Sequence, residues 1–359
     1  MIFGEKYTLL TPKPNATISE KIDDLFGKLQ SLDADMKREN RVRVFGRLYF
    51  SDILNQLPLF KESALCESLE QAPFSYIEQA PLDGSRLSLI VAYASGVQIA
   101  RLEDNAWEIV SQVGKAYFHS IRLSGKEVTN LTSKHQTEEQ FRRHKRFLNE
   151  RGLNLRDNCI RTWIYVRDID YHYAGVVAGR NNIFREEGLK ADDHFIASTG
   201  IGGYGSNSTT AVCVDFLSID APSKIKYLHA TEWLNPTHEY GVAFERGTAV
   251  TLQNTKTLFI SGTASIDKFG NCVHRGNVIK QTERLFQNID HLLKDGESSL
   301  ADIRVLIVYL RDISDYHLVS AYLKEHFPQI PMVITEARVC RPEWLIEVEC
   351  IASRRVINC

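Results

Sequence analysis

The stretch QTERLFQNIDHLLKDGESSLADIRVLIVYLRDI, residues 281–313, decides the fold, because a related stretch occurs earlier in the same chain. The earlier stretch, residues 136–169, reads QTEEQFRRHKRFLNERGLNLRDNCIRTWIYVRDI. Both begin with Gln-Thr-Glu, and both end with Tyr, then Val or Leu, then Arg-Asp-Ile. One insertion reconciles their lengths. Such internal similarity predicts that the same structural unit is built at least twice.

Hydrophobic spacing in the second copy predicts a mixed α+β unit. Leu285, Ile289, Leu292 and Leu293 recur at helical intervals, so we expect an amphipathic helix over about residues 280–294 that ends at Gly296. The β-branched run Ile303–Leu310 is typical of a buried strand. The other expected elements are a helix over Asp312–Phe327 and strands over Leu258–Ile266, Met332–Cys340 and Leu345–Ala352. The predicted order is β-β-α-β-α-β-β, with helices covering one face of a sheet.

The first copy follows the same order, and a fainter echo occurs at the N-terminus. In the first copy we expect a hairpin near 108–128, helices over 136–150 and 171–187, and strands over 160–167, 194–200 and 210–218. At the N-terminus we expect a helix over Ile18–Leu32, a strand over Val42–Phe50, and a hairpin over 73–95 around Asp83-Gly84.

These ranges predict two domains, residues 1–220 and 221–359, with Pro222–Pro236 as the connector. The N-terminal domain would contain a degenerate unit, 1–107, and a clear copy, 108–220. Three units in one chain would form a fused, pseudo-trimeric arrangement with clefts between neighbouring units. Because repetition within the chain replaces association of three chains, we expect a monomer or a dimer.

Composition excludes several classes of function. The chain has 359 residues, 43% of them hydrophobic, and a net charge of −2, so no overall field favours nucleic acid or an anionic membrane. The seven cysteines are scattered without a C-x-x-C pair, and the eleven histidines lack metal-ligand spacing. We therefore expect no disulfide framework, no metal and no cofactor.

Two local signals are set aside. Residues 200–205, Gly-Ile-Gly-Gly-Tyr-Gly, match G-x-G-x-x-G, but the following residues are strand-like, whereas a dinucleotide site needs a helix there. The basic run 142–146 follows glutamates on a predicted helix and is typical of a solvated face. The opening MIFGEKYTLLTPKPN lacks a basic segment followed by an apolar run, and no stretch is long enough to span a membrane. We expect a cytoplasmic protein without nucleic-acid or membrane partners.

The C-terminal copy resembles the RidA/YjgF family, small trimeric proteins of the chorismate mutase-like fold that hydrolyse enamines and imines. The matching residues are SGTA (261–264), Gln281 with Asn288, YLRD (309–312) and ITEARVCRPEWLIEVECIA (334–352). The length of the chain and the motifs SGTASI (261–266) and VCRPEWLIEVE (339–349) resemble the two-domain chorismatase branch of that superfamily.

The resemblance implies roles for particular residues. Glu347 aligns with the carboxylate that activates water in RidA proteins and protonates the substrate in chorismatases. Arg338 falls where RidA proteins hold the substrate carboxylate, whereas Glu336 and Gly175 stand where chorismatases carry basic residues. The remaining residues expected to line the substrate site are Cys340, Tyr173, Arg180, Gly262, Thr263 and Ala264.

The residue types fit this chemistry. Cleavage of an enol ether or an imine needs a proton donor and a positioned water molecule, and a partly buried carboxyl group serves both needs. Glu347 and Glu349 lie on the same face of a strand, so their proximity should raise at least one pKa. In the first copy Cys213 aligns with Glu347 and Asp215 with Glu349, which predicts one active site per chain.

Three functions remain open from the sequence. The first is a hydrolase or lyase acting on a small anionic carboxylate, with Glu347 as general acid and base. It would cleave chorismate to pyruvate and a dihydroxycyclohexadienoate, or deaminate an imine or enamine. The second is a ligand-binding or regulatory protein without turnover. The third is an endoribonuclease, which the near-neutral charge disfavours.

Overall fold

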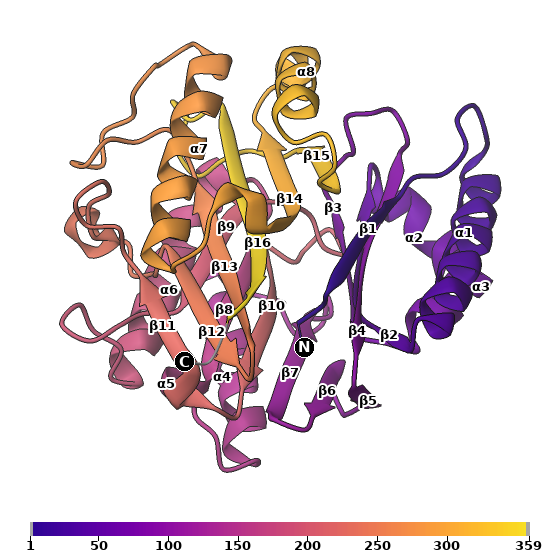
Figure 1. Ribbon diagram of the computed structural model, residues 1–359, viewed down its shortest axis with the longest axis horizontal. Helices are drawn as coiled ribbons and strands as arrows, with labels where there is room; N and C mark the ends of the chain where they lie inside the picture. Colours follow the sequence, from indigo (N-terminus) through magenta and orange to yellow (C-terminus); the bar gives the residue numbers. More distant parts are fainter. Residues whose placement is uncertain (1–2, 357–359) are drawn as a thin grey trace.

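The computed structural model describes residues 3–356, and these residues form three β-sheets (Figure 1). The four-stranded sheet has the order β1-β4-β2-β3, and the two six-stranded sheets have the orders β5-β6-β7-β10-β8-β9 and β11-β12-β13-β16-β14-β15. Each sheet is built from one contiguous segment of chain. The last four strands in each order occupy equivalent positions, so the three sheets share one topology.

The first unit contains the four-stranded sheet and the helices α1 to α3. Its elements are β1 (Lys6–Leu10), α1 (Ile18–Arg38), β2 (Arg41–Phe50), α2 (Ile53–Lys61), α3 (Ala64–Leu69), β3 (Phe74–Glu78) and β4 (Leu87–Ser95). The predicted hairpin over 73–95 is wrong. Strand β2, the longest strand of this sheet, lies between β3 and β4, and it pairs parallel with β3 and antiparallel with β4.

The second unit contains a six-stranded sheet. Its elements are β5 (Val97–Arg101), β6 (Ala106–Ser111), β7 (Gly114–Ile121), α4 (Ser133–Asn149), α5 (Leu155–Asn158), β8 (Cys159–Val166), α6 (Ile169–Glu186), β9 (Ala197–Gly202) and β10 (Val212–Ile219). Strand β5, which the predicted boundary at residue 107 assigns to the first unit, pairs with β6 of this sheet. The division into domains stays a prediction.

The third unit repeats that plan. Its elements are η1 (Pro222–Lys224), β11 (Ile225–Leu228), η2 (Thr237–Tyr240), β12 (Gly247–Leu252), β13 (Thr255–Thr263), α7 (Val278–Asp295), η3 (Leu300–Asp302), β14 (Ile303–Leu310), η4 (Ile313–Asp315), α8 (Tyr316–His326), β15 (Met332–Glu336) and β16 (Ile346–Arg355). The predicted α+β order is confirmed, with one further strand in front. That strand, β11, lies within the expected connector.

Strand β15 ends four residues earlier than predicted, at Glu336. Beyond it the chain leaves its own sheet and runs beside β9 of the second unit. The amide of Gly202 donates to the carbonyl oxygen of Arg338 at 2.9 Å, and Ile201 forms a bridge with Val339. Similar bridges join Glu78 to Tyr204 and Pro81 to Thr335. The three units therefore meet in a closed ring.

The repeated Gln-Thr-Glu motif begins a helix and holds the last strand of its unit. The Gln281 side-chain oxygen accepts from the amide of Leu345 at 2.9 Å, and that of Gln136 accepts from the amide of Ala211 at 2.8 Å. At the other end of the repeat, the amides of Arg167 and Arg311 donate to the carbonyl oxygens of Ala211 and Leu345. The motif therefore has the same structural role in both copies.

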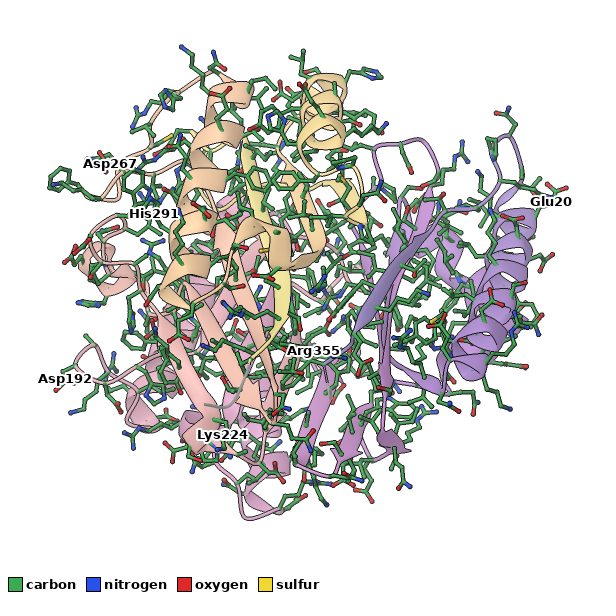
Figure 2. The ribbon with its side chains drawn as sticks, in the orientation of Figure 1. Glu20, Asp192, Lys224, Asp267, His291 and Arg355 are labelled. Atoms are coloured by element: carbon green, nitrogen blue, oxygen red, sulfur yellow. The ribbon has the colours of Figure 1, made fainter. Side chains whose placement is uncertain are left out.

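Helices cover the outer faces of the sheets, and the inner faces pack against one another (Figure 1). Helix α7 packs on its sheet through a buried apolar stripe that includes Leu285, Ile289 and Leu292. Asn277 caps the first turn of this helix. Gly296 follows the helix, where a Cβ atom would lie 2.2 Å from Leu258. Charged side chains such as Glu20 and Asp192 point away from the molecule (Figure 2).

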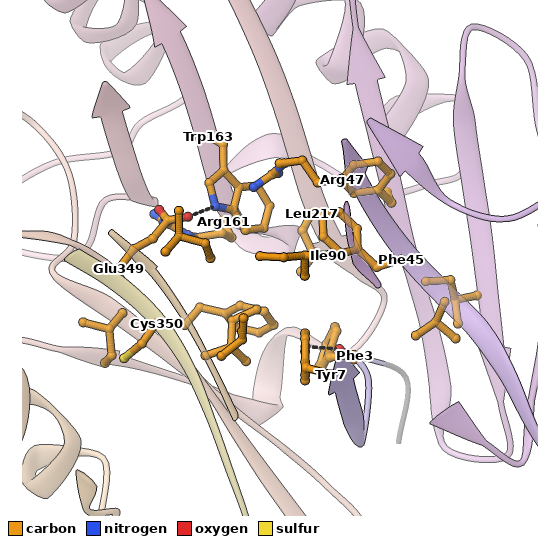
Figure 3. A pocket seen from close by; sticks show the side chains of 18 of the residues that line it. Phe3, Tyr7, Phe45, Arg47, Ile90, Arg161, Trp163, Leu217, Glu349 and Cys350 are labelled. Atoms are coloured by element: carbon orange, nitrogen blue, oxygen red, sulfur yellow. Dashed lines mark hydrogen bonds and ion pairs between the residues drawn. The ribbon is translucent and has the colours of Figure 1, made fainter. Parts of the chain in front are cut away.

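The inner faces form layers around the centre of the ring. Strand alternation places Tyr49, Tyr165 and Tyr309 in one layer, opposite Ser88, Cys213 and Glu347 on the neighbouring strands. The next layer contains buried charges, among them Arg47 and Glu349 (Figure 3). Within residues 3–356 no helix is long and apolar enough to cross a membrane, and the six cysteines there are free thiols. The seventh, Cys359, lies outside the described residues.

Candidate active site

A cavity of about 230 Å³ lies between the second and third units. Helix α6 and strand β9 form one wall. Strands β13 and β16, with the segment after β15, form the other. The lining residues are Tyr173, Arg180, Ser198, Gly200, Val242, Phe244, Arg246, Gly262, Ala264, Ile266, Cys340, Arg341, Trp344 and Glu347. The structure thus brings together six of the eight residues predicted for the site.

Glu347 is the carboxyl group of this cavity. Its side chain projects from β16, and the residue is only 4% exposed. Burial, and after it the charge of Glu349, raise the pKa of Glu347 to about 8, against the opposing effect of Arg161. No side chain among residues 3–356 donates a hydrogen bond to this carboxyl group. At neutral pH it is therefore mostly a neutral acid, able to donate a proton.

Gly262 makes room for that carboxyl group. A Cβ atom at residue 262 would lie 1.9 Å from Oε1 of Glu347 and 2.7 Å from its carboxyl carbon. The amide of Gly262 donates to the Thr199 hydroxyl at 2.9 Å, which ties β13 to β9 of the neighbouring unit. Any larger residue here would displace Glu347 from the cavity.

Glu349, two residues along the same strand, has a different environment. Its carboxylate accepts from the Arg161 guanidinium at 2.6 Å, from the Trp163 indole at 2.9 Å and from the Thr199 hydroxyl. Figure 3 shows the bond to Trp163. All three donors belong to the second unit, so this carboxylate joins two units. Its partners satisfy it, whereas Glu347 faces the cavity.

Three arginines give the cavity a positive character. Arg180 is 2% exposed, and its guanidinium carbon lies 5.8 Å from the centre of the Phe244 ring. Arg246 donates to the backbone and side-chain oxygens of Asn235 at 2.8–3.1 Å. Arg341 lies over the Trp344 ring at 5.3 Å. With Glu347 neutral, these cations favour an anionic ligand that also has an apolar surface.

Tyr173 and Cys340 lie together beside Glu347. Burial raises the pKa of Tyr173 well above its usual value, and the Cys340 thiol raises it further. Burial, then the Glu347 charge, raises the pKa of Cys340 to about 12. A thiol this weakly acidic is a poor nucleophile. Both groups therefore line the cavity as neutral hydrogen-bonding side chains.

The structure does not bring Arg338 or Thr263 into this cavity. Arg338 is 65% exposed and donates to Asp170 at 3.0 Å, outside the lining of the Glu347 cavity. The Thr263 hydroxyl donates to the carbonyl oxygen of Ser261. Gly175 faces helix α4, where a Cβ atom would lie 2.2 Å from the Ser133 hydroxyl oxygen, so a basic residue there could not reach the cavity.

Sequence reasoning missed several lining residues. Arg341 and Trp344 lie inside the quoted motif VCRPEWLIEVE, so their position next to Cys340 was a usable signal. Phe244 and Arg246 lie in an irregular segment ahead of β12, and no spacing in the sequence points to them. Within the described residues 3–356, no group of three His, Cys, Asp or Glu side chains could hold a metal ion.

The fold and the cavity define a class of protein: three fused α+β units with a single acidic side chain in one of the clefts between them. Residues 245–354 match the model of the endoribonuclease L-PSP family. The chain is 30% identical over 101 residues to 3-aminoacrylate deaminase RutC of Acinetobacter baylyi, covering 77% of that protein and 26% of this chain. The chain belongs to this family, the RidA/YjgF group of proteins.

Two further similarities extend the comparison. A RutC family protein of Pyrococcus abyssi is 30% identical over 99 residues, which cover 78% of that protein and 27% of this chain. The crystal structure of a chorismatase superimposes with a TM-score of 0.69 at 18% sequence identity, covering 98% of this chain and all of the other. The chorismatase-like arrangement of RidA-like units thus extends over the whole chain.

Proposed function

We propose that this chain is a hydrolase or lyase for a small anionic carboxylate with an enol-ether bond, chorismatase-like in its chemistry and independent of a cofactor. The observation that carries the proposal is the state of Glu347, a buried carboxyl group with a pKa of about 8 in a cavity lined by three arginines. A carboxyl group that stays protonated at neutral pH is suited to act as a general acid.

The proposed reaction begins with proton transfer from Glu347 to the terminal carbon of the enol ether. The resulting cation adds a water molecule, whose proton returns to the Glu347 carboxylate. The hemiketal then collapses, its carbon–oxygen bond breaks, and pyruvate leaves with the hydroxylated ring as the second product. For chorismate that product is a dihydroxycyclohexadienoate. Atoms balance with water as the only other reactant, and Glu347 returns to its starting state.

The cavity supports an anionic substrate of this kind. Arg180 and Arg341 come from different units, so a molecule with two carboxylates could contact both walls of the cleft. The rings of Tyr173, Phe244 and Trp344 offer the apolar surface that a six-membered ring needs. Arg338, which the sequence suggested as the carboxylate anchor, is replaced in this proposal by Arg180.

A second candidate function is deamination of an enamine or imine. The similarity to 3-aminoacrylate deaminase over the third unit favours it. That reaction requires Glu347 to activate water as a carboxylate, the form that predominates only above about pH 8. Because Arg338 lies outside the cavity, the structure offers less support for this reaction. A ligand-binding protein without turnover would keep the same cavity, and an endoribonuclease would need a wider, basic surface.

The test compares two substrates on two variants. Pyruvate release from chorismate is followed with a coupled lactate dehydrogenase assay, and imine hydrolysis is followed separately by ammonia release. Glu347→Gln is the informative variant, and Glu325→Gln on the exposed face of α8 is the matched control. Pyruvate release that is lost only in Glu347→Gln supports the proposal. Ammonia release without pyruvate would transfer the assignment to the deaminase, and saturable binding without turnover would favour the binding protein.

A further inference from the structure

A second cleft, with a cavity of about 260 Å³, lies between the third and first units. We call it the Lys324 cavity. Helix α8 and strand β15 form one wall, and strands β1 and β4 with the segment around Pro81 form the other. It shares no lining residue with the Glu347 cavity, so the proposed reaction leaves it without a role. The lining residues are Leu9, Thr11, Pro81, Asp83, Ser88, Tyr316, Ser320, Lys324, Met332, Val333 and Ile334.

The cation of this cavity stands where Arg180 stands in the Glu347 cavity. Lys324 follows Arg311 at the same spacing at which Arg180 follows Arg167, and both arginines belong to the repeated Arg-Asp-Ile motif. Lys324 lies on α8 and Arg180 on α6, the helices that follow this motif in their units. The two cations therefore occupy equivalent positions, each on one wall of a cleft between two units.

The acid of the Glu347 cavity has no counterpart here. Ser88 pairs with Tyr49 across β4 and β2, as Glu347 pairs with Tyr309 across β16 and β14. Each of these two residues lines the cavity beside its own sheet. The Ser88 hydroxyl lies 3.0 Å from that of Ser85. The Lys324 cavity is thus an equivalent of the Glu347 cavity in which serine replaces the acid.

The three equivalent clefts are not equally open. Between the first and second units the cavity measures only about 60 Å³. Phe74 and Tyr76 line it from β3, at the register positions that Met332 and Ile334 have in β15. The fold alone therefore does not provide an open cavity, and the side chains of the Lys324 cavity leave one.

The lining combines one cation with apolar surface. Lys324 and Asp83 are the charged residues of the described lining. Oδ1 of Asp83 accepts from the amide of Ser85 at 2.9 Å, and no carboxylate among residues 3–356 forms an ion pair with Lys324. A single free cation favours a ligand with one negative charge and an apolar part. The apolar surface comes from Leu9, Pro81, Tyr316, Met332, Val333 and Ile334.

Ser320 provides a second, independent observation. It is 6% exposed and lies one helical turn before Lys324, so both side chains are on the same face of α8. Its hydroxyl has no hydrogen-bond partner within residues 3–356, yet the oxygen is not among the fully enclosed polar atoms there. The hydroxyl therefore faces the cavity that Ser320 lines. A buried hydroxyl in this position can donate to a ligand.

We infer that the Lys324 cavity binds a small monocarboxylate with a compact apolar part, its oxygens on the Lys324 ammonium and the Ser320 hydroxyl. Because a serine hydroxyl is a far weaker acid than a carboxyl group, Ser88 cannot replace Glu347, and the ligand is bound without turnover. The inference is independent of the reaction proposed for the other cavity. A carboxylate held here contacts the third and first units together.

The test uses a signal that reports on this cavity alone. The chain has three methionines, Met1, Met36 and Met332, and Met332 lines the cavity. The full chain is labelled with ¹³C at the methionine methyl groups, and Met332→Leu assigns the signal. Sodium isovalerate is the probe, and isovaleramide has the same shape without the charge. A ligand that binds only in the Glu347 cavity should leave the Met332 signal in place.

We expect isovalerate to shift the Met332 signal saturably, with a dissociation constant in the millimolar range that is usual for so few atoms. Met36, buried in the first unit, should not respond. Isovaleramide should bind at least about fivefold more weakly, because it lacks the charge that pairs with Lys324.

Variants locate the site. Lys324→Gln, at an exposed position, should weaken isovalerate binding about threefold to fivefold, whereas Lys280→Gln on the exposed face of α7 should leave it unchanged. Ser320→Ala should weaken binding about tenfold, with circular dichroism confirming the fold. A Met332 signal that does not shift, equal binding of isovalerate and isovaleramide, or binding that Lys324→Gln leaves unchanged would overturn the inference.

Discussion

The sheets of the second and third units have the same strand order, yet the same two positions on their central strands carry different chemistry. On β10 these positions hold Cys213 and Asp215, and on β16 they hold Glu347 and Glu349. Asp215 binds Arg47 of the first unit at 3.0 Å, and Glu349 binds Arg161 of the second unit at 2.6 Å. The carboxylate at the second position, Asp215 or Glu349, therefore links two units in both sheets.

The two units differ at the other position, which holds Cys213 in β10 and Glu347 in β16. Cys213 is enclosed, since a Cβ atom at Gly205 would lie 2.5 Å from its sulfur, whereas Glu347 faces a cavity. The carboxylate common to both units thus joins neighbouring units, and the one present in a single unit is the residue that we propose for the chemistry.

The largest effect should follow from Glu347→Gln. Loss of the proton donor should lower kcat about 10²–10⁴-fold on the substrate that the assays identify. In the wild type, kcat should fall above about pH 8 as Glu347 loses its proton. A pH–rate profile measures both effects, and a variant with wild-type kcat would contradict the assignment.

Glu349→Gln and Asp215→Asn should act on stability. Each change leaves a buried arginine without its counter-charge, which costs about 3–5 kcal/mol. Urea denaturation at pH 7 measures the loss. Glu347→Gln serves as the comparison, because it removes a carboxyl group without breaking an ion pair, and it should not destabilise the protein at that pH.

The third unit should lose stability in alkaline solution. The pKa of Glu347 rises from 4.5 unfolded to about 8 folded, so the folded state holds the proton more tightly. Its stabilising contribution is present below pH 4.5 and is lost as the pH rises toward 8. The total is on the order of 5 kcal/mol. Glu347→Gln should flatten this part of the stability curve, and an unchanged curve would argue against the raised pKa.

The second unit should lose stability in acid. His119 and His144 contact each other at 3.2 Å in its core, and burial lowers the pKa of His119 to about 4 and that of His144 well below its usual value. For His119 the contribution is complete above pH 6.5 and is lost as the pH falls toward 4, about 3 kcal/mol in all. His119→Phe should reduce the difference in unfolding free energy between pH 7 and pH 5.

The smallest effect should follow from Cys213→Ala. Removing one buried sulfur atom should cost about 1 kcal/mol, with kcat unchanged. Urea denaturation and the assay for Glu347 measure both quantities. A loss of activity comparable to that of Glu347→Gln would show that the second unit contributes more than a wall of the cavity.

Much of the architecture could be predicted from the sequence, because it follows from local patterns. The stripe Leu285–Leu292 and the strand Ile303–Leu310 are set by residues close in the chain, and the structure confirms them. The repeat was visible because Gln136 and Gln281 form the same hydrogen bond, to the residue just before the last strand of the unit. The pairing of β3 with β2 was not visible, because no local signal distinguishes it from a hairpin with β4.

Only the site residues that lie in a recognisable sequence motif could be predicted. Glu347, Cys340 and Gly262 lie in short stretches with family resemblance, and all three line the cavity. Arg246 reaches it through a segment without regular structure, so its position depends on tertiary contacts with Asn235. The direction of Arg338 depends on Asp170 of another unit, an interaction across 168 residues that spacing in the sequence does not reveal.

The closed ring of three units within one chain has a consequence for behaviour on dilution. In an assembly of separate subunits, the two walls of a cleft come together only above the dissociation constant of that assembly. Here Arg180 and Glu347 belong to one polypeptide, so each wall meets the other at an effective concentration set by the intervening chain. The specific activity of this protein should therefore be independent of its concentration, down to the nanomolar range where separate subunits fall apart.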